Sequence, residues 1–239
     1  MISSMESASG KRNPPVKVLL VDGDPLLREQ LDHIITAEHD LVVCGHAEDR
    51  DKAMQLAETN APELVITDLW LKKSHGLELI KDLQARFPNV LILVVSSHDS
   101  WFYAARAIRA GARGYVTNRA TAETIMEAIR RLLQGETYLT DKLAKEMNTR
   151  LASSTFASRQ LTAAENLTDR ELEVFELVGL GLDSRQIAEQ MRLDVSTVDT
   201  YRAHIKAKLG LKDSSELLRQ AIAWVHGPPP TKGSGLTSS

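Results

Sequence analysis

The feature that most constrains this chain is a short apolar run that ends at an acid. Leu64, Val65 and Ile66 follow one another with no polar alternation, which predicts a strand buried on both faces of a sheet. Asp68 comes just after this run, and open α/β sheets bind ligands beyond the carboxyl ends of their strands. An acid after a strand is often only a turn residue. A second acidic group, Asp22 and Asp24 after the apolar run 18–21, favours a shared acidic site at one sheet edge.

Strand and helix patterns alternate five times between residues 16 and 137. Short connections between alternating units predict a parallel sheet with helices on both faces. We therefore expect a five-stranded, doubly wound, flavodoxin-like α/β domain over 16–137. The expected strands are 16–21, 41–44, 64–67, 90–95 and 114–117, and the expected helices begin at 25, 49 or 50, 76, 101 and 121.

From residue 164 to residue 226 the pattern is purely helical and predicts a small all-α domain. Thr168 followed three residues later by Glu171 forms a capping-box signature before an apolar run. Two short helices, 184–191 and about 196–209, have the spacing of a helix-turn-helix. Residues 138–163 are expected to form a linker with a short helix, and 1–15 and 227–239 to be disordered tails.

Composition excludes several classes of protein. The net charge is −3, so nucleic-acid binding would depend on a local face rather than on bulk charge. One cysteine permits no disulfide within the chain, which fits a reducing compartment. The first fifteen residues lack the apolar core of a signal peptide, and no apolar stretch is long enough to span a membrane. These features predict a cytoplasmic protein without a membrane partner.

The predicted helix 196–209 carries one polar, mildly basic face. From the residues alone, this face fits either a DNA major groove or the solvated side of a small helical bundle. The candidate DNA-binding residues on it and beside it are Arg185, Arg192, Thr197, Asp199, Thr200, Arg202, Ala203, Lys206 and Lys208.

Residues 167–209 closely resemble the LuxR-type helix-turn-helix, from Leu-Thr-Asp-Arg-Glu-Leu-Glu-Val through Gln186-Ile187-Ala188-Glu189 to Lys208-Leu209-Gly210. The resemblance implies that the third helix enters the major groove of double-stranded DNA. Asp199 stands where many members carry Lys; an acid repels phosphate but can accept a hydrogen bond from cytosine N4. Phosphate contacts would then come from Arg185, Arg192, Arg202, Lys206 and Lys208.

Taken together, residues 16–226 resemble a response regulator of the NarL/FixJ type. The resemblance implies that Asp68 is the phospho-acceptor and that a sensor histidine kinase is a partner. It implies that Mg²⁺ is held by Asp22, Asp68 and the backbone carbonyl of Trp70. It also implies that Ser96, Tyr115 and the residue at position 118 are switch residues, which respond when Asp68 is phosphorylated.

The chain departs from this pattern at charged positions. Gly23 replaces the second acid, and Asn118 replaces a Lys, so a metal ligand and a phosphate-binding cation are both missing. Asp24 is a doubtful substitute ligand, since it is better placed to cap the following helix. Either Asp68 is phosphorylated weakly, or the receiver works as a dimerisation or partner-binding module. The loss of charge on both sides of the phosphoryl group favours the second alternative.

We therefore expect a DNA-binding transcriptional regulator rather than an enzyme. One helix-turn-helix reads few bases alone, so a homodimer on repeated half-sites is expected. The leading alternative is a protein-interaction adaptor with weak or lost DNA readout, and a third possibility is a receiver that phosphorylates itself. Substitution of Arg202 and Lys206 discriminates between DNA binding and an adaptor role.

Overall fold

The computed structural model describes residues 14–72, 74–97, 101–152, 166–191 and 193–226. The chain divides into two units, residues 1–148 and 149–239, which are considered separately. No helix in the described ranges is long and apolar enough to cross a bilayer.

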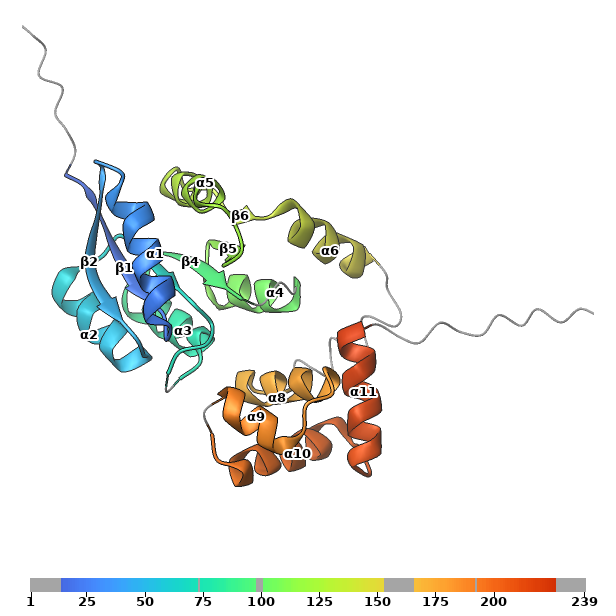
Figure 1. The fold of residues 1–239 in the computed structure, drawn as a ribbon. Coiled ribbons are helices and arrows are strands. Elements are labelled where there is room, and N and C mark those ends of the chain that lie inside the picture. Colours follow the sequence, from blue (N-terminus) through green and yellow to red (C-terminus); the bar gives the residue numbers. More distant parts are fainter. Residues whose placement is uncertain (1–13, 73, 98–100, 153–165, 192, 227–239) are drawn as a thin grey trace, which may run out of the picture. The chain divides into compact units, whose positions relative to one another are not determined.

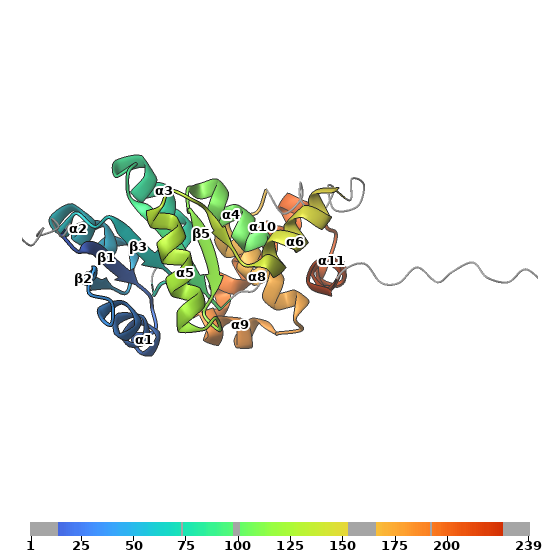
Figure 2. The same cartoon turned by 90° about the horizontal axis from the view of Figure 1, so that it is seen from above.

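The first unit is built on a parallel sheet with the order β2-β1-β3-β4-β5-β6 (Figure 1). The helices α1 and α5 contact one another, while α2, α3 and α4 contact in series (Figure 2). The α1–α5 side encloses a core that includes Leu20, Ile35, Ile66 and Ile129. The elements of this unit are β1 (Val16–Val21), α1 (Pro25–Thr36), β2 (Leu41–Ala47), α2 (Arg50–Asn60), β3 (Leu64–Thr67), α3 (Gly76–Arg86), β4 (Leu91–Ser96), α4 (Trp101–Ala110), β5 (Gly114–Thr117), α5 (Ala122–Leu133) and β6 (Tyr138–Leu139). The helix α6 (Asp141–Ala152) follows β6.

The predicted parallel α/β class is confirmed, but the predicted number of five strands is wrong. Tyr138 and Leu139, which we had assigned to the linker, form β6 and pair with Gly114 and Tyr115 of β5. Two residues are too few to produce a recognisable alternation. β2 also runs on to Ala47, past the apolar residues that predicted it. The register shifts between Val18 and Leu19 of β1, so that Cys44 is passed over and the pairing continues from Gly45 to Ala47.

The second unit contains α8 (Asp169–Gly179), α9 (Ser184–Met191), α10 (Val195–Leu209) and α11 (Ser214–His226). The capping box is present at the start of α8, with Thr168 and Glu171 bonded to each other's backbone. The helix α8 contacts both α10 and α11, and its apolar side chains are buried against them. α10 ends at Gly210, whose φ of +66° is a left-handed conformation that glycine adopts without strain.

Several sequence-based predictions lie outside the described residues. They are the greater part of both tails, the linker from residue 153 to 163, and the candidate phosphate contact Arg192.

Candidate functional site

The sheet register brings the predicted acidic residues to one edge. Val21 of β1 pairs with Thr67 of β3, so Asp22 and Asp68 follow as neighbours at the strand ends. Ser96 pairs with Thr117 at the ends of β4 and β5, and the backbone N–H of Asn118 donates to the carbonyl of Ser96 at 2.8 Å. The carboxyl ends of four strands therefore lie at one polar edge of the sheet, where a doubly wound sheet places its ligand-binding residues.

Asp22 is the more deeply buried of the two acids, with 3 % of its surface exposed. Its Oδ1 accepts from the backbone N–H of Asp24 at 2.7 Å, whereas its buried Oδ2 has no hydrogen-bond partner among the described residues. Burial, reinforced by the charge of Asp68, raises the pKa of Asp22 to about 7. An unpartnered buried carboxylate oxygen is costly unless a proton or a cation satisfies it.

Asp68 is tied into the loop that follows β3. Its Oδ1 accepts from the backbone N–H of Leu69 at 2.6 Å. Burial raises the pKa of Asp68 to about 6, against opposing hydrogen bonds from the Ser96 hydroxyl and the backbone of Leu69 and Trp70. The structure therefore brings the buried Ser96 to the predicted phospho-acceptor. Tyr115 is fully buried on β5, and Asn118 is half-buried just beyond it.

The oxygen atoms at this edge of the sheet are of a type that can bind Mg²⁺. A β-carbon added at Gly23 would lie 3.3 Å from the Trp70 carbonyl oxygen, so position 23 directly faces one of the expected ligands. Asp22 Oδ2, the Asp68 carboxylate and the Trp70 carbonyl are hard oxygen donors, the type that Mg²⁺ prefers. Within the described ranges, no group of three or more His, Cys, Asp or Glu side chains is arranged to hold a metal. The candidate metal ligands at this edge are therefore two carboxylates and one backbone carbonyl.

Two charged side chains near this edge of the sheet, Asp24 and Lys72, are engaged in other contacts. Asp24 caps α1, with its Oδ1 accepting from the backbone N–H of Leu26 at 2.9 Å. Lys72 Nζ lies 2.5 Å from Glu48 Oε2, in an ion pair at the rim. Arg28, which we did not single out from the sequence, donates from Nη1 to the backbone carbonyl of Asp22. Its position one turn into α1 is the only sequence signal that could have indicated this contact.

In the second unit, the exposed surface of α10 is nearly free of positive charge in its first half. Val195, Ser196, Asp199, Thr200 and Ala203 are exposed at helical spacing and lie on one stripe, while Val198 and Ile205 are buried. The predicted residues Thr197, Arg202 and Lys206 are half-buried beside this stripe, and Arg185 is exposed on α9.

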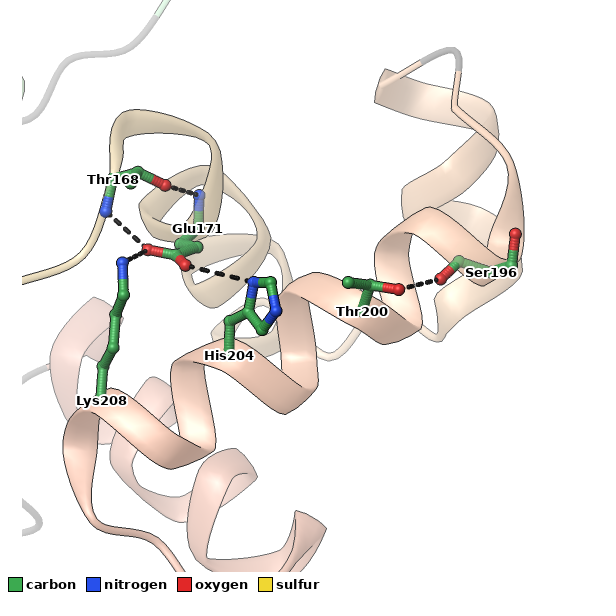
Figure 3. A network of polar contacts seen from close by, with 6 residues as sticks. All are labelled: Thr168, Glu171, Ser196, Thr200, His204 and Lys208. Atoms are coloured by element: carbon green, nitrogen blue, oxygen red, sulfur yellow. Dashed lines mark hydrogen bonds and ion pairs between the residues drawn. The ribbon is translucent and has the colours of Figure 1, made fainter.

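Lys208 belongs to a polar network around Glu171 (Figure 3). Its Nζ lies 2.6 Å from Glu171 Oε2, which also accepts from the backbone N–H of Thr168 at 2.7 Å. His204 Nδ1 lies 3.7 Å from the other Glu171 oxygen. Burial acts to raise the pKa of Glu171, but the hydrogen bonds from Lys208 and Thr168 outweigh it and hold this pKa below its usual value. Lys208 thus ties α10 to α8, a role that the sequence did not suggest.

A second network joins α9 to α10. Ser184 Oγ donates to Asp199 Oδ1 at 2.8 Å, and Arg202 Nη1 donates to Ser184 Oγ at 3.1 Å. Ser184 was not among the residues that we selected from the sequence. Its position at the first residue of α9 is the only sequence signal, and it does not identify a partner fifteen residues away.

Comparison with known proteins agrees with both units. Residues 18–130 match the family model for the response regulator receiver domain, and residues 165–221 match that for bacterial regulatory proteins of the luxR family. The uncharacterized transcriptional regulatory protein YxjL of Bacillus subtilis (strain 168) is 33 % identical over 211 residues, which cover 87 % of this chain and 95 % of that protein. The oxygen regulatory protein NreC of Staphylococcus aureus (strain MRSA252) is 30 % identical over 213 residues, with 87 % and 97 % coverage.

Solved structures show the same architecture. A LuxR-family two-component response regulator from an Aurantimonas species has a TM-score of 0.55 at 27 % identity, covering 57 % of this chain and 98 % of that one. RcsB of Salmonella enterica serovar Typhimurium, bound to a promoter, has a TM-score of 0.54 at 19 % identity and covers 87 % of this chain and 98 % of its own, a likeness of fold alone.

A receiver sheet followed by a helix-turn-helix unit defines a DNA-binding transcriptional response regulator of a two-component system. The chain belongs to the NarL/FixJ-type family of these regulators, and its matches cover 95 % and 97 % of the two relatives named above.

Proposed function

We propose that this regulator binds repeated DNA half-sites as a cytoplasmic homodimer and that its output does not depend on phosphoryl transfer to Asp68. In this proposal the receiver serves as a dimerisation or partner-binding module, and the protein acts as a regulator rather than as an enzyme. The observation that carries the proposal is that two nearby charged side chains, Asp24 and Lys72, are engaged in other contacts instead of replacing the missing acid and cation. Asp24 is bound to the start of α1, and Lys72 is bound to Glu48.

Phosphoryl transfer to a carboxylate depends on positive charge around the transferred group. Asp22, Asp68 and the Trp70 carbonyl would hold Mg²⁺, which would neutralise part of the charge on that group when bound. On the other side of the phosphoryl group, Asn118 can donate a hydrogen bond but supplies no charge. The raised pKa of Asp22 adds competition between a proton and the metal ion near neutral pH.

Phosphorylation can be tested on the full chain with acetyl phosphate and Mg²⁺, read by intact mass at neutral pH. We expect no adduct on the wild-type protein over a wide range of Mg²⁺ concentration. The double variant Gly23→Asp, Asn118→Lys should form an adduct, because it regains a metal ligand and a phosphate-binding cation. The added carboxylate should also tighten Mg²⁺ binding at least about tenfold by calorimetry. Asp68→Ala in the same background is the matched control and should remain unmodified.

If the wild-type protein forms an adduct and the single variant Asp68→Ala does not, phosphorylation independence is contradicted. In that case a sensor histidine kinase becomes the expected partner of this receiver, and Asp22 suffices to bind the metal.

DNA binding through α10 is tested by removing its flanking cations. We expect Arg202→Ala with Lys206→Ala to weaken binding to genomic fragments by at least about tenfold and to lower the slope of log affinity against log salt by about 2. Phosphate contacts release counterions, so the loss of Lys206 should affect all sequences alike, whereas the loss of Arg202 also removes its hydrogen bond to Ser184. Gel-shift titrations at several salt concentrations measure both quantities.

The control for this experiment is Lys52→Ala, which removes an exposed cation from α2 in the other unit. It should leave the affinity and the slope unchanged. An unchanged DNA affinity in the Arg202, Lys206 double variant would favour the adaptor alternative, in which the helical unit binds a protein instead.

A dimer contact on DNA is proposed for the exposed part of α11. Leu218 and Ile222, four residues apart, are 40 % and 42 % exposed, whereas Leu217 on the same helix is fully buried. Trp224 packs against Phe175 of α8, with ring centroids 6.3 Å apart, and so belongs to the core of the unit.

A further inference from the structure

We infer that Asp199 reads a base directly, selecting cytosine at one position of each half-site. The inference rests on the proposed DNA-binding function of α10 and names what that helix recognises. It follows from the chemistry of the exposed stripe, from the hydrogen bonds that hold the Asp199 carboxylate, and from the pattern of groups in the major groove.

The exposed stripe in the first half of α10 lacks the usual reader of guanine. Val195, Ser196, Asp199, Thr200 and Ala203 contain neither Arg nor Lys, so none of them can donate the paired hydrogen bonds by which these residues recognise O6 and N7 of guanine. The single charged group on this stripe is an acceptor. Ala203, one turn further on, has a side chain small enough to let the helix approach the base edges closely.

The neighbouring hydroxyl group is already used within the helix. Thr200 Oγ1 donates to the backbone carbonyl of Ser196 at 2.8 Å (Figure 3). The hydroxyl hydrogen is therefore committed, and the Thr200 methyl group is the part suited to an apolar contact such as a thymine methyl. Ser196 and Asp199 are then the polar side chains of the stripe that can contact a base, and of these two only Asp199 is charged.

The Asp199 carboxylate is held in place by α9. Ser184 has one hydroxyl hydrogen, and because its oxygen accepts from Arg202 Nη1, that hydrogen is directed to Asp199 Oδ1. The chain of two hydrogen bonds fixes the side chain of an exposed residue before DNA arrives, which lowers the entropy cost of a directional contact. Asp199 Oδ2 is the atom that we assign to the base.

A carboxylate oxygen at the major-groove edge favours cytosine among the four bases. Guanine presents O6 and N7 and thymine presents O4, all acceptors that repel it. Adenine offers the N6 amino group but places the acceptor N7 beside it, whereas cytosine offers N4 next to a C–H group. Cytosine is therefore the base that gives the carboxylate a hydrogen bond with no acceptor beside it on the same base. The same charge repels phosphate and so weakens binding to random DNA.

The test is selection of binding sites from a random duplex pool by the full-length protein. The wild-type protein should enrich a half-site in which one position is cytosine, with a preference of about tenfold over the other bases. Asp199→Ala should lose the preference at that position alone. Asp199→Asn, which is nearly isosteric, should shift it toward adenine, since an amide matches N6 and N7 together. Ser184→Ala should reduce the preference without abolishing it.

Glu189→Gln is the matched control, because it removes one negative charge from an exposed position of α9 and should leave the enriched site unchanged. If the wild-type protein selects a site and both Asp199 variants select the same bases at every position, the inference is overturned while DNA binding stands. If the wild-type protein retains no DNA at low salt, the proposed function fails, and base reading by Asp199 fails with it.

Discussion

At pH 8 and without divalent cations, the Asp22→Asn variant should exceed the wild-type protein in free energy of unfolding by about 2–4 kcal/mol. Asp22 is buried at the end of β1 with its Oδ2 unpartnered, and its pKa is raised from 3.8 to about 7. The folded protein therefore holds this proton more tightly than the unfolded chain does. Wild-type stability should fall as the pH rises from about 4 to about 7, and the loss is complete above that range.

The advantage of the Asn variant should consequently vanish below about pH 4 and be largest above pH 7. Hydrogen exchange at increasing urea, read on peptides of β1 and β3 by mass spectrometry, isolates this unit from the helical one. Asp24→Asn is the control: it also removes one negative charge, keeps an oxygen to cap α1, and should change stability by less than about 0.5 kcal/mol. Equal stability of Asp22→Asn and wild type at pH 8 would contradict a buried, unsatisfied carboxylate at this position.

Mg²⁺ should reduce the difference in free energy of unfolding between Asp22→Asn and the wild-type protein. A cation bound to the ionised Asp22 carboxylate stabilises only the wild-type folded state. The size of this effect gives a measure of metal affinity that does not depend on phosphorylation.

Local patterns predicted most of the elements because each pattern needs only neighbouring residues. The run Leu64–Ile66 identified β3, and Thr168 with Glu171 identified the start of α8 by hydrogen bonds between residues three apart. The rule that the carboxyl ends of parallel strands lie at one edge of the sheet also correctly predicted that Asp22 and Asp68 are neighbours. In contrast, β6 has no pattern of its own and exists because β5 presents a free edge to it.

The details of the candidate sites depend on contacts between distant segments, which no local pattern contains. Lys208 was predicted to contact phosphate, but it lies 2.6 Å from a carboxylate oxygen of Glu171, 37 residues earlier. From the sequence alone Asp24 fits a metal ligand as well as a helix cap, and the cap depends on the bond that its carboxylate accepts from the backbone N–H of Leu26. Asp199 was recognised as a departure from the family, but its attachment to Ser184 depends on how α9 and α10 pack.

The close approach of α8 to α11 makes Gly179 the position in the helical unit where one methyl group should cost most. A β-carbon at Gly179 would overlap the backbone carbonyl oxygen of Ala221 and would lie 2.6 Å from Val225 Cγ2. Backbone cannot move aside as a side chain can, so the helices must separate. We expect Gly179→Ala to destabilise this unit by about 3 kcal/mol, the upper end for overpacking.

Because α8 also holds α10 through Glu171 and Lys208, the variant should lose DNA affinity together with stability. Hydrogen exchange of α11 peptides and gel-shift titration of the same preparation measure the two effects, and the sheet unit should exchange as in the wild-type protein. Leu180→Ala is the control, since this neighbouring side chain is 51 % exposed and its loss should change neither quantity appreciably. Wild-type exchange and DNA affinity in Gly179→Ala would mean that α8 and α11 lie further apart than described. If Gly179→Ala loses DNA binding while hydrogen exchange of α11 is unchanged, the α8–α11 contact does not determine the stability of the unit. The contact would then have a direct role in DNA recognition.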